Sequence, residues 1–314
     1  MKDINEAIKE FDANYDLCAS YILNEDKKSF LGDKGKPKCR FCGRGIDEGA
    51  TFKEEAHALS HLIGNNRLFS YYECDECNHK HSTYENDFAA YMKFYHCILQ
   101  VHGKNGVPSY RLWKSRMDAQ NKHMDVKLYE DDPTLTCSLN EKENSVTFNG
   151  LRTYTPLNVY KALLKMALTI LPAEDTCNLK DAFKFLSCVT VHPKVELPVL
   201  FNMFGGSANV YKYVAAMLFK RKAASTAKVP SYWFVLAYNN ICFQMPLMGS
   251  LLDKELDGCT VDCNILPTPP HIIGFPIIVN KLLDLSGVEK IKNEPLTLSL
   301  KFETMEAVDL VKRK

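Results

Sequence analysis

Two short cysteine motifs, Cys39-Arg-Phe-Cys42 and Cys74-Asp-Glu-Cys77, stand out in the N-terminal third of the sequence. Two thiolates separated by two residues can bind one tetrahedral ion from a tight turn, so the four cysteines predict a structural zinc site. The 31 residues between the two pairs, 43–73, include Thr51-Phe-Lys-Glu-Glu-Ala-His57. Simple zinc ribbons usually have about 15–20 residues at this place. The longer insert has room for two strands and a loop, and it carries a histidine.

The residues around the motifs predict a strand, a loop, a second strand and a helix. Residues 50–59 favour a strand, 60–66 are typical of a turn-rich loop, and the aromatic segment 68–73 favours a second strand. From Asn78 or Ser82 to about His96, apolar residues recur at helical spacing. We therefore expect a small module in which the second cysteine pair lies at the start of a helix.

Several polar residues of this helix would share one face. Asn78, His81 and Glu85 fall at helical offsets of zero, three and seven, and His57 lies on the strand expected to pack against them. Hydrolysis of a phosphodiester with one metal ion needs a histidine opposite oxygen and nitrogen ligands for the cation. An imidazole takes a proton from water, and a hard cation neutralises the charge that develops on the phosphate.

This part of the chain resembles the HNH endonucleases, which have the ββα-metal or His-Me finger fold, and among them the subtype held together by four cysteines. The residues that carry the resemblance are Cys39-x-x-Cys42, Phe52-Lys-Glu-Glu-Ala-His57, Gly64-Asn65-Asn66, and Glu73-Cys-Asp-Glu-Cys-Asn78 followed by Glu85-Asn-Asp.

The resemblance implies a role for each matched residue. His57 would be the general base, Asn65 or Asn66 would brace the strand and the loop, and Asn78 would bind the catalytic divalent cation. The predicted catalytic set is therefore His57, Asn66 and Asn78, with Mg²⁺, Mn²⁺ or Ni²⁺ as the cation. The products of such a reaction carry a 5′-phosphate and a 3′-hydroxyl.

One position departs from the family pattern. Many members have Asp immediately before the base histidine as a second metal ligand, and this chain has Ala56. Three residues could replace it. Glu85 shares the helix face of Asn78 but lies seven residues, about 10.5 Å, along the axis. His81 is nearer to Asn78, and Glu55 shares a strand face with His57.

Composition narrows the classes of protein and partner. The chain is 46% hydrophobic and 25% charged, as in ordinary globular proteins, and its 39 Lys and Arg residues balance 38 Asp and Glu. Any DNA contact must therefore come from local basic patches. Twelve cysteines, no recognisable signal peptide and no long apolar run lead us to expect a cytoplasmic protein that does not contact a membrane.

The fold class expected from the sequence is α+β, with a zinc-clamped ββα-metal, treble-clef-like nuclease module and a larger mixed α/β C-terminal domain. We divide the chain into an N-terminal helix and linker (1–37), the module (38–100), a basic connector (101–130) and the large domain (131–314). The basic residues of the connector could follow a DNA backbone or form a solvated surface. Residues 1–30 show helical spacing of apolar residues.

The large domain contains several recognisable elements. Thr155-Pro156 is a typical helix start, and the apolar helix that follows should reach Leu171. The remaining expected elements are a helix over 181–189, a hairpin of 232–237 and 241–246, and strands over 146–148, 272–279 and 296–302, with Asn149-Gly150 as a turn.

Two functions from different classes follow from these observations. The first is a metal-dependent DNA endonuclease serving restriction or antiviral defence, with a regulatory ligand or protein partner bound by the large domain. The second is a non-catalytic treble-clef zinc protein that binds DNA or a protein, in which Ala56 marks lost catalysis. The sequence leaves open whether the chain forms an oligomer.

Overall fold

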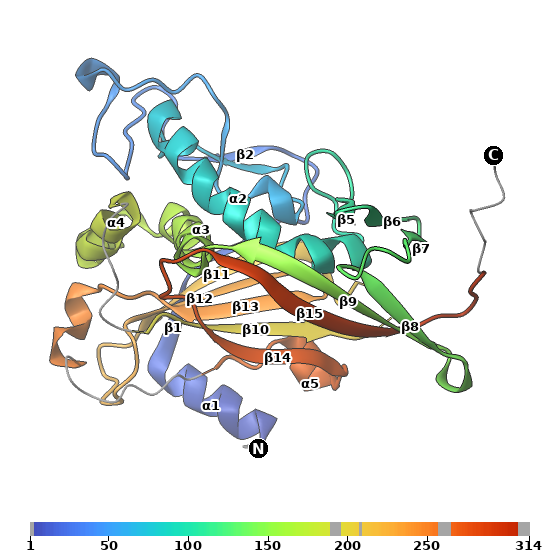
Figure 1. Cartoon of the computed structure of the whole chain (residues 1–314). Coiled ribbons are helices and arrows are strands. Elements are labelled where there is room, and N and C mark those ends of the chain that lie inside the picture. Colours follow the sequence, from blue (N-terminus) through green and yellow to red (C-terminus); the bar gives the residue numbers. More distant parts are fainter. Residues whose placement is uncertain (1–2, 189–195, 207–208, 257–264, 307–314) are drawn as a thin grey trace.

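A six-stranded antiparallel sheet forms the centre of the fold (Figure 1). The protein is described by a computed structural model, which covers residues 3–188, 196–206, 209–256 and 265–306. The strands of this sheet, in spatial order, are β1 (Tyr15–Ile22), β11 (Tyr211–Arg221), β12 (Tyr232–Asn239), β13 (Ile241–Pro246), β10 (Pro198–Phe204) and β14 (Ile277–Asp284).

The two faces of this sheet are covered by different helices. The helices are α1 (Ile4–Asn14), α2 (Asp75–Ile98), α3 (Pro156–Ile170), α4 (Lys180–Ser187) and α5 (Pro269–Ile273). Figure 1 shows α2 and α3 on one side of the sheet and α1 and α5 on the other.

Strand β12 shows how the sequence produces this layering. Its residues alternate between the two faces, as the pleat of a strand requires. Phe234 and Leu236 join the core beneath α2 and α3, whereas Trp233 and Val235 join the core beneath α1. Because both faces are covered, the strand is buried from Tyr232 to Tyr238. Its pairing with β13 confirms the predicted hairpin.

Three smaller sheets of three strands each surround the centre. Their strands are β2 (Ser29–Leu31), β4 (Leu68–Ser70) and β3 (Ala56–His57) in the first, β5 (Tyr110–Leu112), β6 (Ser115–Gln120) and β7 (His123–Lys127) in the second, and β15 (Ile291–Lys301), β9 (Ser145–Tyr154) and β8 (Thr136–Asn140) in the third. Short 3₁₀ helices span Ile46–Glu48, His61–Ile63, Glu141–Glu143, Ala173–Leu179 and Leu251–Leu256.

The mixed α+β class is confirmed, and so are several elements of the large domain. Helix α3 begins at Pro156 as predicted. Helix α4 (Lys180–Ser187) overlaps the helix expected over 181–189. Strand β15 (Ile291–Lys301) includes most of the strand expected over 296–302 but starts earlier, at Ile291. The expected end of the helix over 181–189 falls at residue 189, which lies outside the described residues.

Other expectations were wrong. The helix over residues 1–30 ends at Asn14, and β1 follows directly because it pairs with β11, about 200 residues away. The segment 101–130 contains the strands β5, β6 and β7, and its role as a connector stays a prediction. The segment 272–279 is divided between α5 and β14, since Gly274 takes a left-handed conformation (φ 82°) that ends the helix.

The turn predicted at Asn149-Gly150 is also absent, because β9 runs straight through it. A Cβ atom at Gly150 would lie 2.5 Å from the hydroxyl oxygen of Tyr110. This hydroxyl oxygen accepts a hydrogen bond from the backbone amide of Leu151, next to Gly150. Glycine is therefore needed here for the close approach of a side chain, and not for a turn.

The hydrophobic core runs without interruption from the zinc module into the large domain. One cluster of buried residues extends from Cys39 to Leu298, and Phe88 and Tyr95 of α2 contact Phe243 and Phe201 of the central sheet. The domain boundaries drawn from the sequence stay a prediction. Within the described residues, no helix combines the length and the hydropathy needed to cross a membrane.

Candidate metal centre and candidate active site

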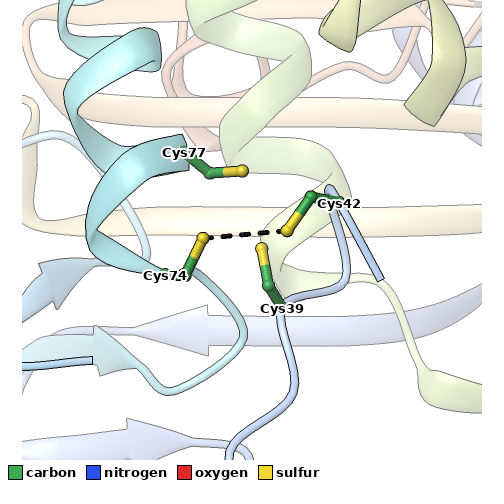
Figure 2. A group of neighbouring side chains, drawn as sticks. All are labelled: Cys39, Cys42, Cys74 and Cys77. Carbon is green, nitrogen blue, oxygen red and sulfur yellow. Dashed lines mark hydrogen bonds between the residues drawn. The ribbon is translucent and has the colours of Figure 1, made fainter. Parts of the chain in front are cut away.

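The four cysteines come together at the start of α2. Cys39 and Cys42 lie on a loop, Cys74 is the N-cap of α2, and Cys77 lies in its first turn (Figure 2). All four sulfur atoms lie within 4.8 Å of one another. A tetrahedral zinc ion with Zn–S bonds of about 2.3 Å separates its sulfur ligands by roughly 3.8 Å. The cluster therefore fits a metal ion such as zinc, as the sequence predicted.

Local backbone geometry brings the first pair into position. The amide of Gly43 donates to the carbonyl of Cys39 (2.8 Å), and the amide of Cys39 donates to the carbonyl of Arg44 (2.9 Å). Gly43 has a φ of 77°, which few other residues adopt. Cys39 and Cys74 are fully buried, whereas Cys42 is exposed.

The thiols strongly influence each other's ionisation. A hydrogen bond from the thiol of Cys77 lowers the pKa of Cys39 to about 5, and the same bond raises the pKa of Cys77. One thiolate is thus stabilised at the cost of its neighbours. A bound divalent cation would allow several of these sulfurs to ionise together.

Arg40 fastens the first cysteine loop to the large domain. Its guanidinium donates to the carbonyls of Leu168, Thr169 and Leu171 at distances of 2.8–3.1 Å, and it lies 3.5 Å from the centre of the Tyr72 ring. A cation at this place satisfies carbonyls at the C-terminal end of α3 and interacts favourably with the helix dipole.

His57 lies at the end of β3, where the strand pairs with β4. Its half-buried ring contacts the rings of Phe69 and His61, each at 4.7 Å between ring centres. Burial, with the nearby charges of His61 and Lys165, lowers the pKa of His57 to about 4. The imidazole is therefore neutral at physiological pH and can accept a proton.

Asn65 braces the loop between β3 and β4. Its side chain is fully buried, and its amide donates to the carbonyls of Leu59 (2.6 Å) and Leu68 (2.8 Å). Its oxygen accepts from the amides of Leu68 (2.9 Å) and Arg67 (3.1 Å). Asn66, which we placed in the catalytic set, is exposed, so the bracing role belongs to Asn65.

Asn78 pairs with a residue that the sequence analysis did not single out. Its amide donates to the carboxylate of Glu54 (2.9 Å) on the exposed side of α2. The backbone amides of Lys53 and Glu54 donate in turn to Asp75 (3.1 and 3.0 Å). The segment before β3 is therefore fixed to the first turn of α2, with Glu54 beside Asn78.

The other expected cation ligands are not brought together. Glu55 forms an exposed ion pair with Lys28 (2.8 Å), His81 is buried against Glu73 (2.6 Å), and Glu85 accepts from the hydroxyl of Ser60 (2.8 Å). Among the His, Cys, Asp and Glu side chains of the described residues, groups of three or more with metal-binding spacing are limited to the four cysteines.

Two facts explain this outcome. Helical rise separates Asn78 from Glu85 by about 10.5 Å, and His81 points to the buried side of α2. Glu73, Glu85 and the ammonium of Lys165 form a buried ion cluster there. The sequence analysis missed this cluster, although a lysine inside the apolar segment Ala162-Leu-Leu-Lys-Met-Ala-Leu168 indicates a buried charge that needs a partner.

Comparison with known proteins found no relative of this chain. No protein-family model, curated protein or solved structure matches the chain significantly. The functional argument therefore depends on the residues and their geometry.

Proposed function

We propose that this chain is a metal-dependent DNA endonuclease of the HNH type, with His57 as general base and a structural zinc ion on the four cysteines. The observation that carries the proposal is the position of His57. A half-buried, neutral imidazole ends the first strand of a strand–loop–strand–helix unit whose helix begins at the cysteine cluster. The buried Asn65 braces its loop, as the resemblance requires of an asparagine here.

The proposed reaction is hydrolysis of a phosphodiester bond in DNA. His57 takes a proton from a water molecule, and the resulting hydroxide attacks phosphorus. The bond from phosphorus to the 3′-oxygen breaks, and the leaving 3′-oxygen takes a proton from water, which gives a 5′-phosphate and a 3′-hydroxyl. A divalent cation supplies charge neutralisation at the phosphate when bound.

Glu54 offers a second oxygen donor beside Asn78, the cation ligand that the resemblance implies. Their side chains share a hydrogen bond of 2.9 Å at the exposed start of α2. Mg²⁺ often takes only one or two protein oxygens, together with water and substrate phosphate. We propose that this pair replaces the set of Asn78, His81, Glu85 and Glu55, which the fold does not assemble.

For the rest of the chain we propose a recognition role. The large domain would bind DNA, a regulatory ligand or a protein partner, and such a nuclease would serve restriction or antiviral defence. This step depends on analogy with other nucleases that carry a second domain.

One observation favours a second candidate function, a non-catalytic zinc module that binds DNA or a protein. Ala56 offers no ligand, and the carboxylate of Glu85 is already paired with Lys165 (3.6 Å) and Ser60. In that case the cysteine cluster would stabilise a binding surface.

Nicking of supercoiled plasmid by the full chain separates the two candidates. The nuclease proposal expects cleavage with Mg²⁺, Mn²⁺ or Ni²⁺, and loss of cleavage in His57→Ala at unchanged zinc content. His79→Ala is the matched control, because His79 is an exposed histidine of the same module. A zinc-loaded wild type that binds DNA and cuts with none of the three cations would support the binding module.

A further inference from the structure

Lys165 lies at the centre of α3 and is almost completely buried, with 1% of its surface exposed. Its ammonium has three partners, one carbonyl oxygen and two carboxylates, and all three belong to the zinc module. It donates to the carbonyl oxygen of His57 (2.8 Å), pairs with Glu73 (3.0 Å) and lies 3.6 Å from Glu85. A single side chain of the large domain thus contacts β3, the residue before the second cysteine pair, and α2.

The charge state of this cluster follows from its partners. Burial alone would lower the pKa of Lys165, but the attraction of Glu73 and Glu85 outweighs it and raises the pKa. Burial would likewise raise the pKa of Glu73, but Lys165 and His81 together lower it. The cluster is therefore an ion pair within the core.

A buried ion pair is weak evidence for stability, because apolar residues of similar volume often stabilise a core equally well. In this protein the ion pair fixes the relative positions of several segments. The ammonium bonds to the backbone of His57 itself, and it pairs with Glu85, which also accepts from Ser60 in the following loop. One cation thus connects the end of β3, the loop after it and α2.

We propose that Lys165 is a positioning residue of the candidate active site, through which the large domain fixes the end of β3 and so the direction of the His57 side chain. The inference rests on the proposed function for its catalytic consequence. Its structural consequence, a strand held by a residue of another segment, can be measured without any nuclease activity.

The chain provides a matched control one helical turn away. Lys161 lies on the same helix and is also 1% exposed, but its ammonium bonds to the carbonyl of Cys188. Lys161→Met and Lys165→Met therefore remove the same buried charge from the same helix. Only the second change removes contacts with His57, Glu73 and Glu85.

The catalytic test compares steady-state nicking of plasmid by these variants of the full chain, below their unfolding temperatures. We expect kcat to fall at least tenfold in Lys165→Met with KM for plasmid unchanged, and to change less than threefold in Lys161→Met. In Lys165→Met the buried carboxylate of Glu73 keeps only His81 as a partner. The double variant Glu73→Gln/Lys165→Met removes this charge, so it should regain thermal stability but not kcat. Equal kcat values in Lys165→Met and Lys161→Met would overturn the proposal.

Hydrogen exchange provides a readout that does not depend on activity. The amide of Ala58 donates to the carbonyl of Leu68 (3.1 Å), and this bond follows directly after His57. We expect the segment 56–59 to exchange at least tenfold faster in Lys165→Met than in Lys161→Met. If wild type cuts no DNA, the proposed function fails, and exchange alone decides the inference. Equal exchange in the two variants would refute it.

Discussion

The imidazole of His57 lies between two rings, half-buried, and its pKa is about 4 because burial disfavours its charged form. A neutral imidazole has a lone pair that can accept a proton, whereas an imidazolium has none. The residue type and position were predictable from the spacing after the first cysteine pair. Its environment was not, because Phe69 and Lys165 come from other segments.

Asn65 makes four hydrogen bonds from a fully buried site, so its removal would take a partner from the carbonyl of Leu59 and from the amides of Arg67 and Leu68. The carbonyl of Leu68 would keep its bond from the amide of Ala58 (3.1 Å). We expect Asn65→Ala to lower the free energy of unfolding by about 2–4 kcal/mol, since each unsatisfied buried group costs about 1–3 kcal/mol. Asn66→Ala should change it by less than about 0.5 kcal/mol, as is usual at exposed positions.

Urea unfolding at neutral pH measures both values. Equal effects of the two substitutions would contradict the bracing role of Asn65. The sequence could not distinguish these neighbours, because which of them points inward depends on the conformation of the loop that follows a short 3₁₀ helix, His61–Ile63.

At the scale of elements, α2 connects the metal centre to the central sheet. Its first turn carries Cys74 and Cys77, and its C-terminal half packs against the sheet. The start of α3 was predictable from Thr155-Pro156, which acts locally. Strand β1 was not, because its partner β11 lies far away in the sequence, and tertiary pairing overrides local periodicity.

Removal of one cysteine tests the metal centre. We expect Cys77→Ser to lose most of one bound zinc ion per chain, because the other three sulfurs no longer complete a tetrahedron. The melting temperature should fall as well, since zinc binding to a structural site stabilises the fold. Cys177→Ser, at an exposed cysteine outside the cluster, is the control. Metal content by mass spectrometry would contradict the assignment if both variants kept zinc equally.

At the scale of the whole molecule, one core joins the zinc module to the central sheet. His96 of α2 illustrates this, since its Nε2 atom lies 2.9 Å from the hydroxyl of Tyr238 in β12, and both residues are buried. Such long-range packing could not be predicted from the sequence, which suggested separate segments. Length and composition indicate domain number only loosely.

His96 also gives the stability a pH dependence. Burial lowers its pKa to about 3, from 6.5 in an exposed histidine. Between pH 6.5 and 3 the unfolded chain therefore binds a proton that the folded chain does not. The free energy of unfolding should fall with decreasing pH by up to about 1.4 kcal/mol per pH unit.

Urea unfolding at pH 7 and pH 5 measures this loss. His96→Phe should remove that contribution, whereas His79→Ala, at an exposed position, should leave it in place. An unchanged difference between the two pH values in His96→Phe would show that other groups cause the acid sensitivity.

We propose that His57 activates water for cleavage of DNA. The single-turnover cleavage rate of an end-labelled DNA duplex with Mn²⁺, measured for wild type and His57→Ala at equal zinc content, tests this role. We expect the substitution to lower the rate by about 10²–10⁴-fold, the contribution usual for a general base. Equal rates for the two proteins, or no cleavage by either, would contradict it.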